Sequence, residues 1–147
     1  MISSAKGIDV PQTPFLEELK LLIRSRYGVI IIESCEEERV ESLLRLLADQ
    51  IGLPIFTWTR SRALVRDGEQ RGIYGTDAPV SALNHIKTSK FPGIYLFKGL
   101  ESELDDAATL DLVKEVAKVY GRQDGVLLLL GTQIDLPDTL RPQTAPI

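Results

Sequence analysis

The alternation of apolar and polar positions divides the chain into helices and strands. Apolar residues recur at helical spacing in residues 14–27, 34–51, 79–87 and 106–120. Between these segments, four short runs are mostly apolar and rich in aliphatic or aromatic residues, namely residues 29–33, 54–59, 93–97 and 126–130. Such runs are typical of strands that are covered on both faces. The alternation therefore predicts a three-layer αβα domain with a mainly parallel four-stranded sheet.

The boundaries of this domain follow from the distribution of glycine and proline. We expect a flexible segment over residues 1–13, a single α/β domain over residues 14–136 and an irregular tail over residues 137–147. The first segment lacks periodicity, and three prolines interrupt the tail. Residues 60–77 are polar and contain three glycines, which predicts a long loop with at most a strand pair at its ends.

Composition and charge exclude several classes of partner. The 147-residue chain has a net charge of −4 and a pI of about 5.1, whereas nucleic acids and anionic membranes attract positive surfaces. Its single cysteine excludes an internal disulfide. The longest apolar run, residues 126–130, is far shorter than the roughly 20 residues that a membrane helix needs. We therefore expect a cytoplasmic protein with no nucleic-acid partner and no membrane partner.

The turn after the first strand lies where a nucleotide-binding α/β protein has its phosphate loop. It reads SCEEER (residues 34–39) and contains neither the glycines nor the lysine that hold a phosphate. Ser34 as N-cap and Glu37 three residues later would form a capping box that stabilises the helix start. The alternative is a surface for a basic partner, made by the acidic turn Glu36, Glu37, Glu38 and Arg39.

A second group of candidates follows the aromatic strand at residues 54–59. Arginine beside an aromatic ring can bind a phosphate or a base. The plainer interpretation is a solvated loop with local salt bridges. The candidates in this region are Trp58, Arg60, Arg62, Arg66 and Arg71.

No motif in the chain points to catalysis. The third strand is followed by Lys98-Gly99, whereas an active P-loop ATPase has acidic residues there for Mg²⁺. His85 is the single histidine and has no Ser or Cys nucleophile pattern near it. We therefore expect no catalytic residue, no metal and no cofactor.

Three segments resemble the N-terminal part of a cyanobacterial and plastid AAA-type ATPase family, the one named for hypothetical chloroplast reading frame forty-six. They are FLEELKLLIRSRYGVIIIESCEEERVESLLRLLADQIGLPIFTWTRSRAL, FPGIYLFKGLESELDD and VLLLLGTQIDLPDTLRP, and the resemblance covers about residues 14–142. It implies a degenerate P-loop domain whose four strands have the order 2-3-4-1. In that family the working phosphate loop lies in a later AAA module. ATPase activity does not carry over, because this chain has no GxxxxGK[ST] motif.

The same resemblance raises a question about the first strand. An AAA core adds a fifth strand beside it, but the proline-rich tail offers no obvious one. We therefore expect residues 29–33 (VIIIE) to form an unpaired apolar edge that a protein partner, a second copy of the chain or the ATPase module of the family covers.

These observations favour a non-catalytic protein-interaction or regulatory domain. The alternative is a domain that binds ATP or ADP through the helix dipole and the arginines without hydrolysing it. The resemblance implies a cyanobacterial cytoplasm or a plastid stroma as the location.

Overall fold

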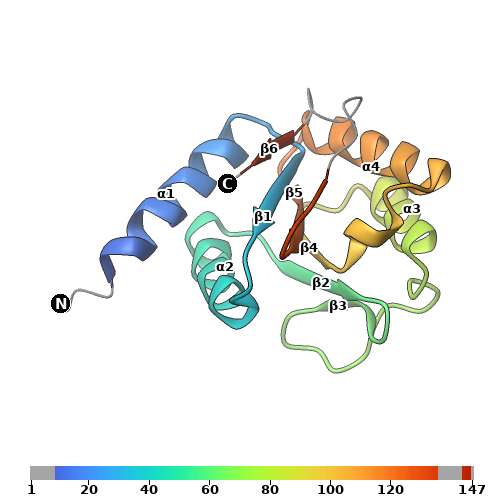
Figure 1. The fold of residues 1–147 in the computed structure, drawn as a ribbon, viewed down its shortest axis with the longest axis horizontal. Coiled ribbons are helices and arrows are strands. Elements are labelled where there is room, and N and C mark those ends of the chain that lie inside the picture. The colour runs from blue at the N-terminus through green and yellow to red at the C-terminus, as the bar shows by residue number, and fades with distance from the viewer. Residues whose placement is uncertain (1–8, 136–143, 147) are drawn as a thin grey trace.

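A computed structural model describes residues 9–135 and 144–146 and confirms the three-layer α/β architecture (Figure 1). Over these residues the sheet has the strand order β3-β2-β4-β5-β1-β6. β3 pairs antiparallel with β2, and the other neighbouring strands are parallel. The central order β2-β4-β5-β1 confirms the order that the family resemblance implied. The strands are β1 (Val29–Glu33), β2 (Ile55–Thr59), β3 (Ala63–Arg66), β4 (Ile94–Lys98), β5 (Val126–Gly131) and β6 (Thr144–Pro146).

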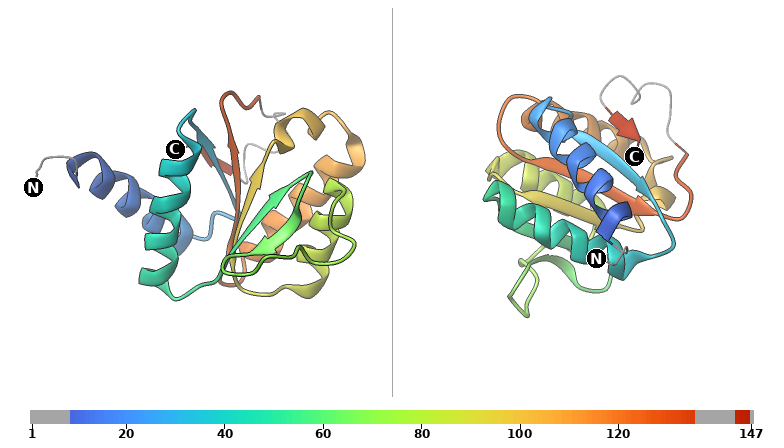
Figure 2. Two further views of the ribbon diagram at one scale, coloured as in Figure 1. Left: turned by 90° about the horizontal axis from the view of Figure 1, so that it is seen from below. Right: turned by 90° about the vertical axis from the view of Figure 1, so that its left-hand side faces the viewer.

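Helices cover the two faces of the sheet in pairs (Figure 2). One face carries α1 and α2, and the other carries α3 and α4. A short 3₁₀ helix, η1, follows β4. None of the described helices is long and apolar enough to cross a membrane. The bounds are α1 (Asp9–Arg24), α2 (Glu37–Ile51), α3 (Pro79–Ser89), η1 (Leu100–Glu103) and α4 (Ala107–Tyr120).

The central strands are continuously apolar because alternate side chains enter two separate cores. In β1, Ile30 and Ile32 pack toward α1 and α2, whereas Val29 and Ile31 pack toward α3 and α4. The same alternation runs through β5. All four of these β1 side chains are at most 4% exposed. This two-sided burial makes the strands recognisable in the sequence.

The first helix is longer than predicted at its start and shorter at its end. It begins at Asp9, so residues 9–13 are helical rather than flexible, and residues 1–8 lie outside the described chain. Pro14 lies inside the helix instead of opening it. The helix ends before Tyr27 because Arg26 adopts a left-handed conformation with a φ of 66°. The Tyr27 N–H then donates to the Leu22 carbonyl at 3.2 Å and closes the turn.

The C-terminal residues correct the prediction of an unpaired first strand. β6 pairs with β1 in parallel, with Thr144 opposite Val29 and Pro146 opposite Ile31. The expected irregular tail therefore contains a strand, and this strand is the fifth one of an AAA core. A proline is compatible with this position because β6 lies at the edge of the sheet, where a missing N–H can face solvent. Residues 136–143 and 147 lie outside the described chain.

The long loop predicted over residues 60–77 also contains a strand. β3 folds back onto β2 as a hairpin, with Val65 opposite Thr57. The Thr59 hydroxyl accepts a hydrogen bond from the Arg62 N–H at 3.2 Å and stabilises the turn. Ala63 adopts a φ of 64° there, which brings the second strand back beside the first.

The last two helices begin within one residue of their predicted starts. Asp106 is the N-cap of α4, and its carboxylate accepts the Thr109 N–H at 3.0 Å. α3 begins at Pro79 with Ala78 at its N-cap. Val80 of this helix is 39% exposed.

Candidate interaction site at the carboxyl edge of the sheet

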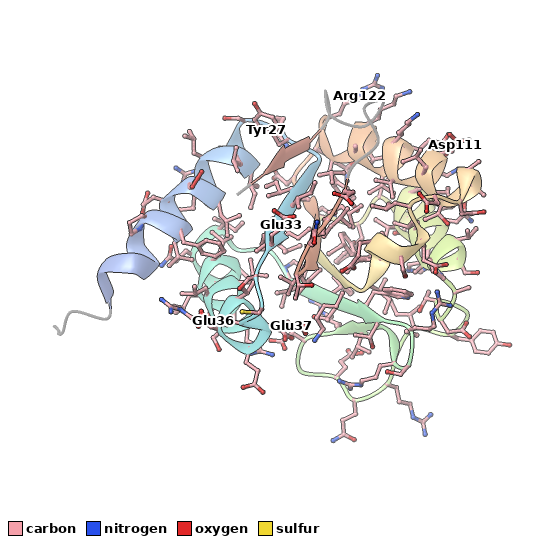
Figure 3. All side chains as sticks on the ribbon, in the orientation of Figure 1. Tyr27, Glu33, Glu36, Glu37, Asp111 and Arg122 are labelled. Carbon is pink, nitrogen blue, oxygen red and sulfur yellow. The ribbon has the colours of Figure 1, made fainter. Side chains whose placement is uncertain are left out.

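The acidic turn lies at the edge where the parallel strands β1, β5 and β4 end, which is where α/β proteins bind ligands. Glu36 and Glu37 lie at the start of α2, close to the end of β1 at Glu33 (Figure 3). The Glu33 carboxylate accepts the Ile134 N–H at 2.8 Å. The Ser34 N–H donates to the Gly131 carbonyl at 2.9 Å. These bonds hold the loops after β1 and β5 together.

The predicted capping box does not form. The N-cap of α2 is Glu36, with φ −100° and ψ 67°, and it makes no side-chain cap bond. The Ser34 hydroxyl accepts the Glu36 N–H at 3.0 Å, so it closes the turn before the helix instead of capping it. The prediction was wrong because α2 begins at Glu37, two residues later than a cap at Ser34 requires. Glu37 instead faces a cation from a distant part of the chain.

That cation is Lys98, at the end of β4. Its ammonium group lies 3.2 Å from a Glu41 carboxylate oxygen and 3.7 Å from one of Glu37. The Lys98 and Glu41 side chains are only 22% and 18% exposed. The ion pairs with Lys98 give Glu37 and Glu41 a structural role. They join the first turns of α2 to the end of β4.

This pair has the opposite polarity to the equivalent groups of a P-loop ATPase. There, a lysine follows the first strand and acidic residues end the strand equivalent to β4. Here, Glu37 follows β1 and Lys98 ends β4. The Lys98 ammonium group is therefore paired with carboxylates of the same chain, Glu37 and Glu41.

The remaining charges of the acidic turn are exposed. Glu36 and Arg39 lie 3.8 Å apart, one helical turn from each other, in a pair that water screens. Glu38 is exposed, and within residues 9–135 no ion pair involves it. The Glu37 side chain is also 52% exposed, so all four residues of the acidic turn remain accessible to a partner.

A hollow of about 250 Å³ opens beside the acidic turn, between α1 and the start of α2. We call it the acidic groove. Its apolar wall is made by side chains of α1, β1 and α2, and its polar rim by the turn. The lining residues are Phe15, Ile32, Glu33, Ser34, Glu36, Arg39, Val40 and Leu43.

Trp58 belongs to the core, which corrects its prediction as a contact residue. It is 1% exposed and stacks on Phe97, with the ring centroids 5.2 Å apart. Its indole N–H donates to the Thr76 carbonyl at 3.0 Å. Trp58 therefore fixes the loop after β3 from inside.

The arginines that follow Trp58 make different contacts. Arg60 pairs with Glu103 of η1 at 3.1 Å. The Arg62 guanidinium donates to the Gln70 carbonyl at 3.5 Å. Arg66 lies over the Phe56 ring, 5.7 Å from its centroid, and Arg71 is exposed. Their role as contact residues stays a prediction.

The sequence prediction missed Lys98 and Glu41 as parts of this site. A signal was present, since Glu37 and Glu41 are four residues apart and so lie on one face of a helix. The sequence did not reveal that this face meets the end of β4, because that contact depends on the order of the strands.

A buried tyrosine pair lies away from this edge. The hydroxyls of Tyr95 and Tyr120 both donate to the Phe91 carbonyl, at 2.6 and 2.7 Å. Burial raises the pKa of both phenols above its ordinary value, and for Tyr120 the hydrogen bond with Tyr95 raises it further. Both groups are therefore neutral hydrogen-bond donors.

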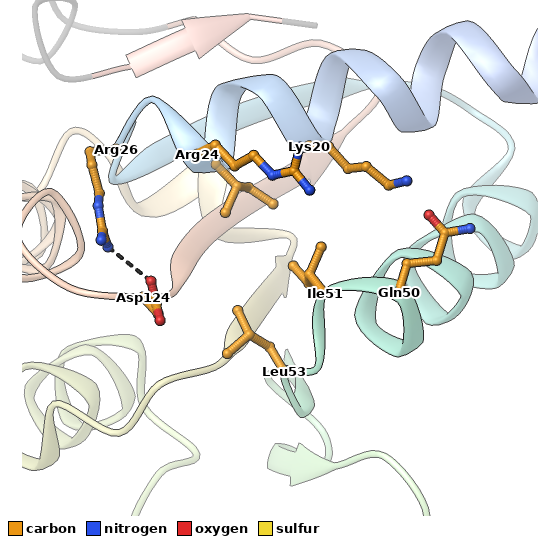
Figure 4. A pocket seen from close by; sticks show the side chains of 8 residues that line it. Lys20, Arg24, Arg26, Gln50, Ile51, Leu53 and Asp124 are labelled. Carbon is orange, nitrogen blue, oxygen red and sulfur yellow. Dashed lines mark hydrogen bonds and ion pairs between the residues drawn. The ribbon is translucent and has the colours of Figure 1, made fainter.

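A second hollow, of about 380 Å³, lies at the opposite edge, between α1 and the end of α2 (Figure 4). Arg26 and Asp124 pair across its mouth at 3.1 Å. It lies at the amino ends of the strands, where α/β proteins rarely bind ligands. Among the described residues, no group of three or more His, Cys, Asp or Glu side chains could hold a metal ion.

The strand order and the acidic turn together define an AAA-like P-loop domain without a phosphate loop. The chain belongs to the family described as the SpoVK-like AAA ATPase N-terminal domain, whose model matches residues 15–147. This match confirms the resemblance seen in the sequence.

Three curated relatives carry the name AAA domain-containing protein ycf46. The protein of Trieres chinensis is 27% identical over 130 residues, which are 86% of this chain and 26% of that protein. The protein of Pyropia yezoensis is 24% identical over 86% of this chain and 26% of its own length. For Guillardia theta the values are 25% identity, 84% and 25%. The chain thus spans about a quarter of the length of these relatives.

Proposed function

We propose that this domain is a non-catalytic protein-interaction module of an AAA-type ATPase, and that the acidic groove binds a basic, partly apolar segment of a partner protein. The observation that carries the proposal is the combination of an apolar wall with an acidic rim in one hollow. Such a surface matches a segment in which lysine or arginine alternates with aliphatic side chains.

The apolar wall supplies the hydrophobic part of the match. Ile32, Val40 and Leu43 are core side chains, at most 6% exposed, that form the floor, while Phe15 is half-buried on the side of α1. A partner's aliphatic side chain could cover Phe15 without moving the floor. Burial of apolar surface contributes roughly 25 cal/mol per Å².

The rim supplies the charge. Glu33 and Glu36 line the groove and Glu38 is exposed beside it, whereas Arg39 is the single cation in the lining. Carboxylates of this kind speed up the encounter with a basic segment and select against an acidic one.

The edge of β1 supports an extended conformation for the bound segment. β6 ends opposite Ile31, so Ile32 and Glu33 have a strand neighbour only on the β5 side within the described residues. A partner segment that continues the line of β6 could hydrogen-bond to this part of β1. A second copy of the chain is the competing occupant of the same edge.

The absence of catalysis and of a bound nucleotide is part of the proposal. It is supported by the missing GxxxxGK[ST] motif and by the pairing of Lys98 with Glu37 and Glu41. The alternative, a domain that holds ATP or ADP, draws on the arginines, whose guanidinium groups contact different parts of the chain. The likeness to the ycf46 proteins supports a cyanobacterial cytoplasm or a plastid stroma as the location.

Fluorescence anisotropy with two labelled peptides tests the proposal. One peptide alternates lysine with valine and leucine, and its counterpart has glutamate in place of lysine. We expect the basic peptide to bind and the acidic one to bind at least tenfold more weakly. Glu36→Lys should weaken binding of the basic peptide at least fivefold. Asp111→Lys on α4 makes the same change of charge at an exposed site on the other face of the sheet and should have little effect (Figure 3).

Equal affinity for the two peptides, or equal effects of the two variants, would contradict the proposal. Isothermal titration calorimetry with ATP or ADP, with and without Mg²⁺, tests the alternative that the domain binds a nucleotide. Micromolar binding that Arg60→Ala removes would favour that alternative, because Arg60 lies outside the cavity that Arg62 lines.

A further inference from the structure

The face of the sheet that carries α1 and α2 has an uncovered end at β2 and β3. Side chains of a strand alternate between faces, so Thr57, Thr59 and Val65 point to the same face as Ile55, which packs in the core below α2. Two of these side chains are threonines instead of the apolar residues that a covering helix would require. This end of the face is therefore more polar than the part below α2.

A cavity of about 150 Å³ lies over this end, beside α2. It is separate from the acidic groove because α2 lines the two with opposite flanks, Glu41 and Arg45 here and Val40 and Leu43 there. Its volume suits one small ionic group rather than a nucleotide. The lining residues are Glu41, Arg45, Thr57, Thr59, Arg62, Val65, Arg66, Asp67, Gly68, Glu69 and Lys98.

The lining has more cationic than acidic side chains, although the whole chain has a net charge of −4. Two of its cations have carboxylate partners. Lys98 pairs with Glu41 at 3.2 Å, and Arg45 pairs with Asp67 at 3.3 Å. These pairs hold two positive groups in fixed positions on the wall.

Arg62 differs from the other cations of the lining. Its guanidinium donates to the Gln70 carbonyl at 3.5 Å, and no carboxylate among the described residues lies within ion-pair distance of it. Arg66, in contrast, directs its guanidinium over the Phe56 ring. Arg62 thus presents guanidinium donors that an oxyanion could accept in bidentate geometry.

The threonines add neutral donors on the floor. The Thr59 hydroxyl accepts the Arg62 N–H at 3.2 Å, so its own hydrogen remains available to a ligand. This bond also fixes the backbone of Arg62 relative to the floor. Thr57 lies one pleat away on the same face.

We propose that this cavity is an oxyanion site, which binds a phosphate or carboxylate group of a ligand through Arg62, with Thr57, Thr59 and Lys98 around it. It lies on the flank of α2 and differs in place from the phosphate loop of a P-loop ATPase, which lies at the start of that helix. The site does not depend on the partner that the acidic groove binds.

Titration of the ¹⁵N-labelled chain with inorganic phosphate, and separately with acetate, tests the proposal by NMR. We expect saturable shifts of the Thr57, Thr59 and Arg62 amides in the millimolar range, at constant ionic strength set with sodium chloride. The anion with the lower dissociation constant identifies the ligand group. Arg62→Ala should weaken binding at least fivefold, and Thr57→Val should weaken it less.

Arg71→Ala is the matched control, because Arg71 is an exposed arginine of the same connecting segment outside the lining. It should bind the anion like the wild type. The proposal is overturned if neither anion shifts these amides beyond the effect of sodium chloride, or if Arg62→Ala and Arg71→Ala have equal effects. Phosphate binding should survive Glu36→Lys, which separates this site from the acidic groove.

Discussion

At the scale of single residues, the most informative side chain is Lys98. It ends β4 in the place of a P-loop acidic residue and contacts two carboxylates of α2. A lysine and a glutamate that are each about four-fifths buried interact more strongly than an exposed pair, because water screens them less. The charge of the acidic turn is thus partly structural and partly available for binding.

The contribution of this contact to stability can be measured directly. We expect Lys98→Ala to lower the free energy of unfolding by about 1 kcal/mol, because Glu37 and Glu41 lose their common cation. Urea denaturation followed by circular dichroism gives the value. Lys87→Ala removes the more exposed pair with Glu115 and should cost less than about 0.5 kcal/mol. A smaller loss for Lys98→Ala than for Lys87→Ala would contradict this account.

At the scale of elements, the sequence predicted those whose signals are local and continuous. The runs that became β1 and β5 each contain at least four consecutive apolar residues, since both faces of the sheet are covered. β6 was missed because it is short and pairs with β1, more than 100 residues earlier in the chain, and β3 was predicted only as part of a possible strand pair at the ends of residues 60–77. The acidic groove was not predicted because it forms only where α1, β1 and α2 pack together.

Helix starts were predicted to different accuracy. The start of α4 was predicted at residue 106, where the Asp106 carboxylate accepts the N–H of Thr109, three residues away. The capping box of α2 was wrong because the helix begins at Glu37, two residues later than a cap at Ser34 requires.

The buried phenols of Tyr95 in β4 and Tyr120 in α4 should make the free energy of unfolding fall at alkaline pH. Burial raises the pKa of Tyr95 and Tyr120 above the ordinary value of 10.0. Below that pH both phenols are neutral in the folded and unfolded chains. Above it the unfolded chain loses protons that the folded chain retains, so the free energy of unfolding falls as the pH rises.

Urea denaturation at pH 9 and pH 11 checks this dependence. Tyr120→Phe should show a smaller fall than the wild type, because it removes one of the two buried phenols. Tyr74→Phe is the control, since Tyr74 is 100% exposed, and it should fall as the wild type does. Identical falls for Tyr120→Phe and the wild type would show that the buried pair does not cause the effect.

At the scale of the whole molecule, β6 completes the sheet. It covers the first part of β1, whose side chains fill both cores, and leaves the end of β1 beside the acidic groove. Edge strands of parallel sheets promote association when they are exposed. The covered part of the edge protects the domain, whereas the open part is where we propose that a partner binds.

Removal of β6 should therefore change the state of association. We expect a chain that ends at residue 143 to self-associate, because Val29, Ile30 and Ile31 lose their edge neighbour. Light scattering over a concentration series, compared with the 147-residue chain, measures the effect. If the shortened chain has the same mass as the longer one at every concentration, β6 is not what protects this edge.

The strand order also determines when β1 can be paired during synthesis. β1 is made early, but its neighbours β5 and β6 lie about 100 residues later in the chain. At 5–20 residues per second, a ribosome needs roughly 5–20 s to produce them. During that interval the four consecutive apolar residues of β1 have no strand partner. The helices on either side of it, α1 and α2, form through contacts that are local in sequence and are synthesised before β5 and β6. We therefore expect these helices to cover the apolar side chains of β1 in the nascent chain, as they cover Ile30 and Ile32 in the folded domain.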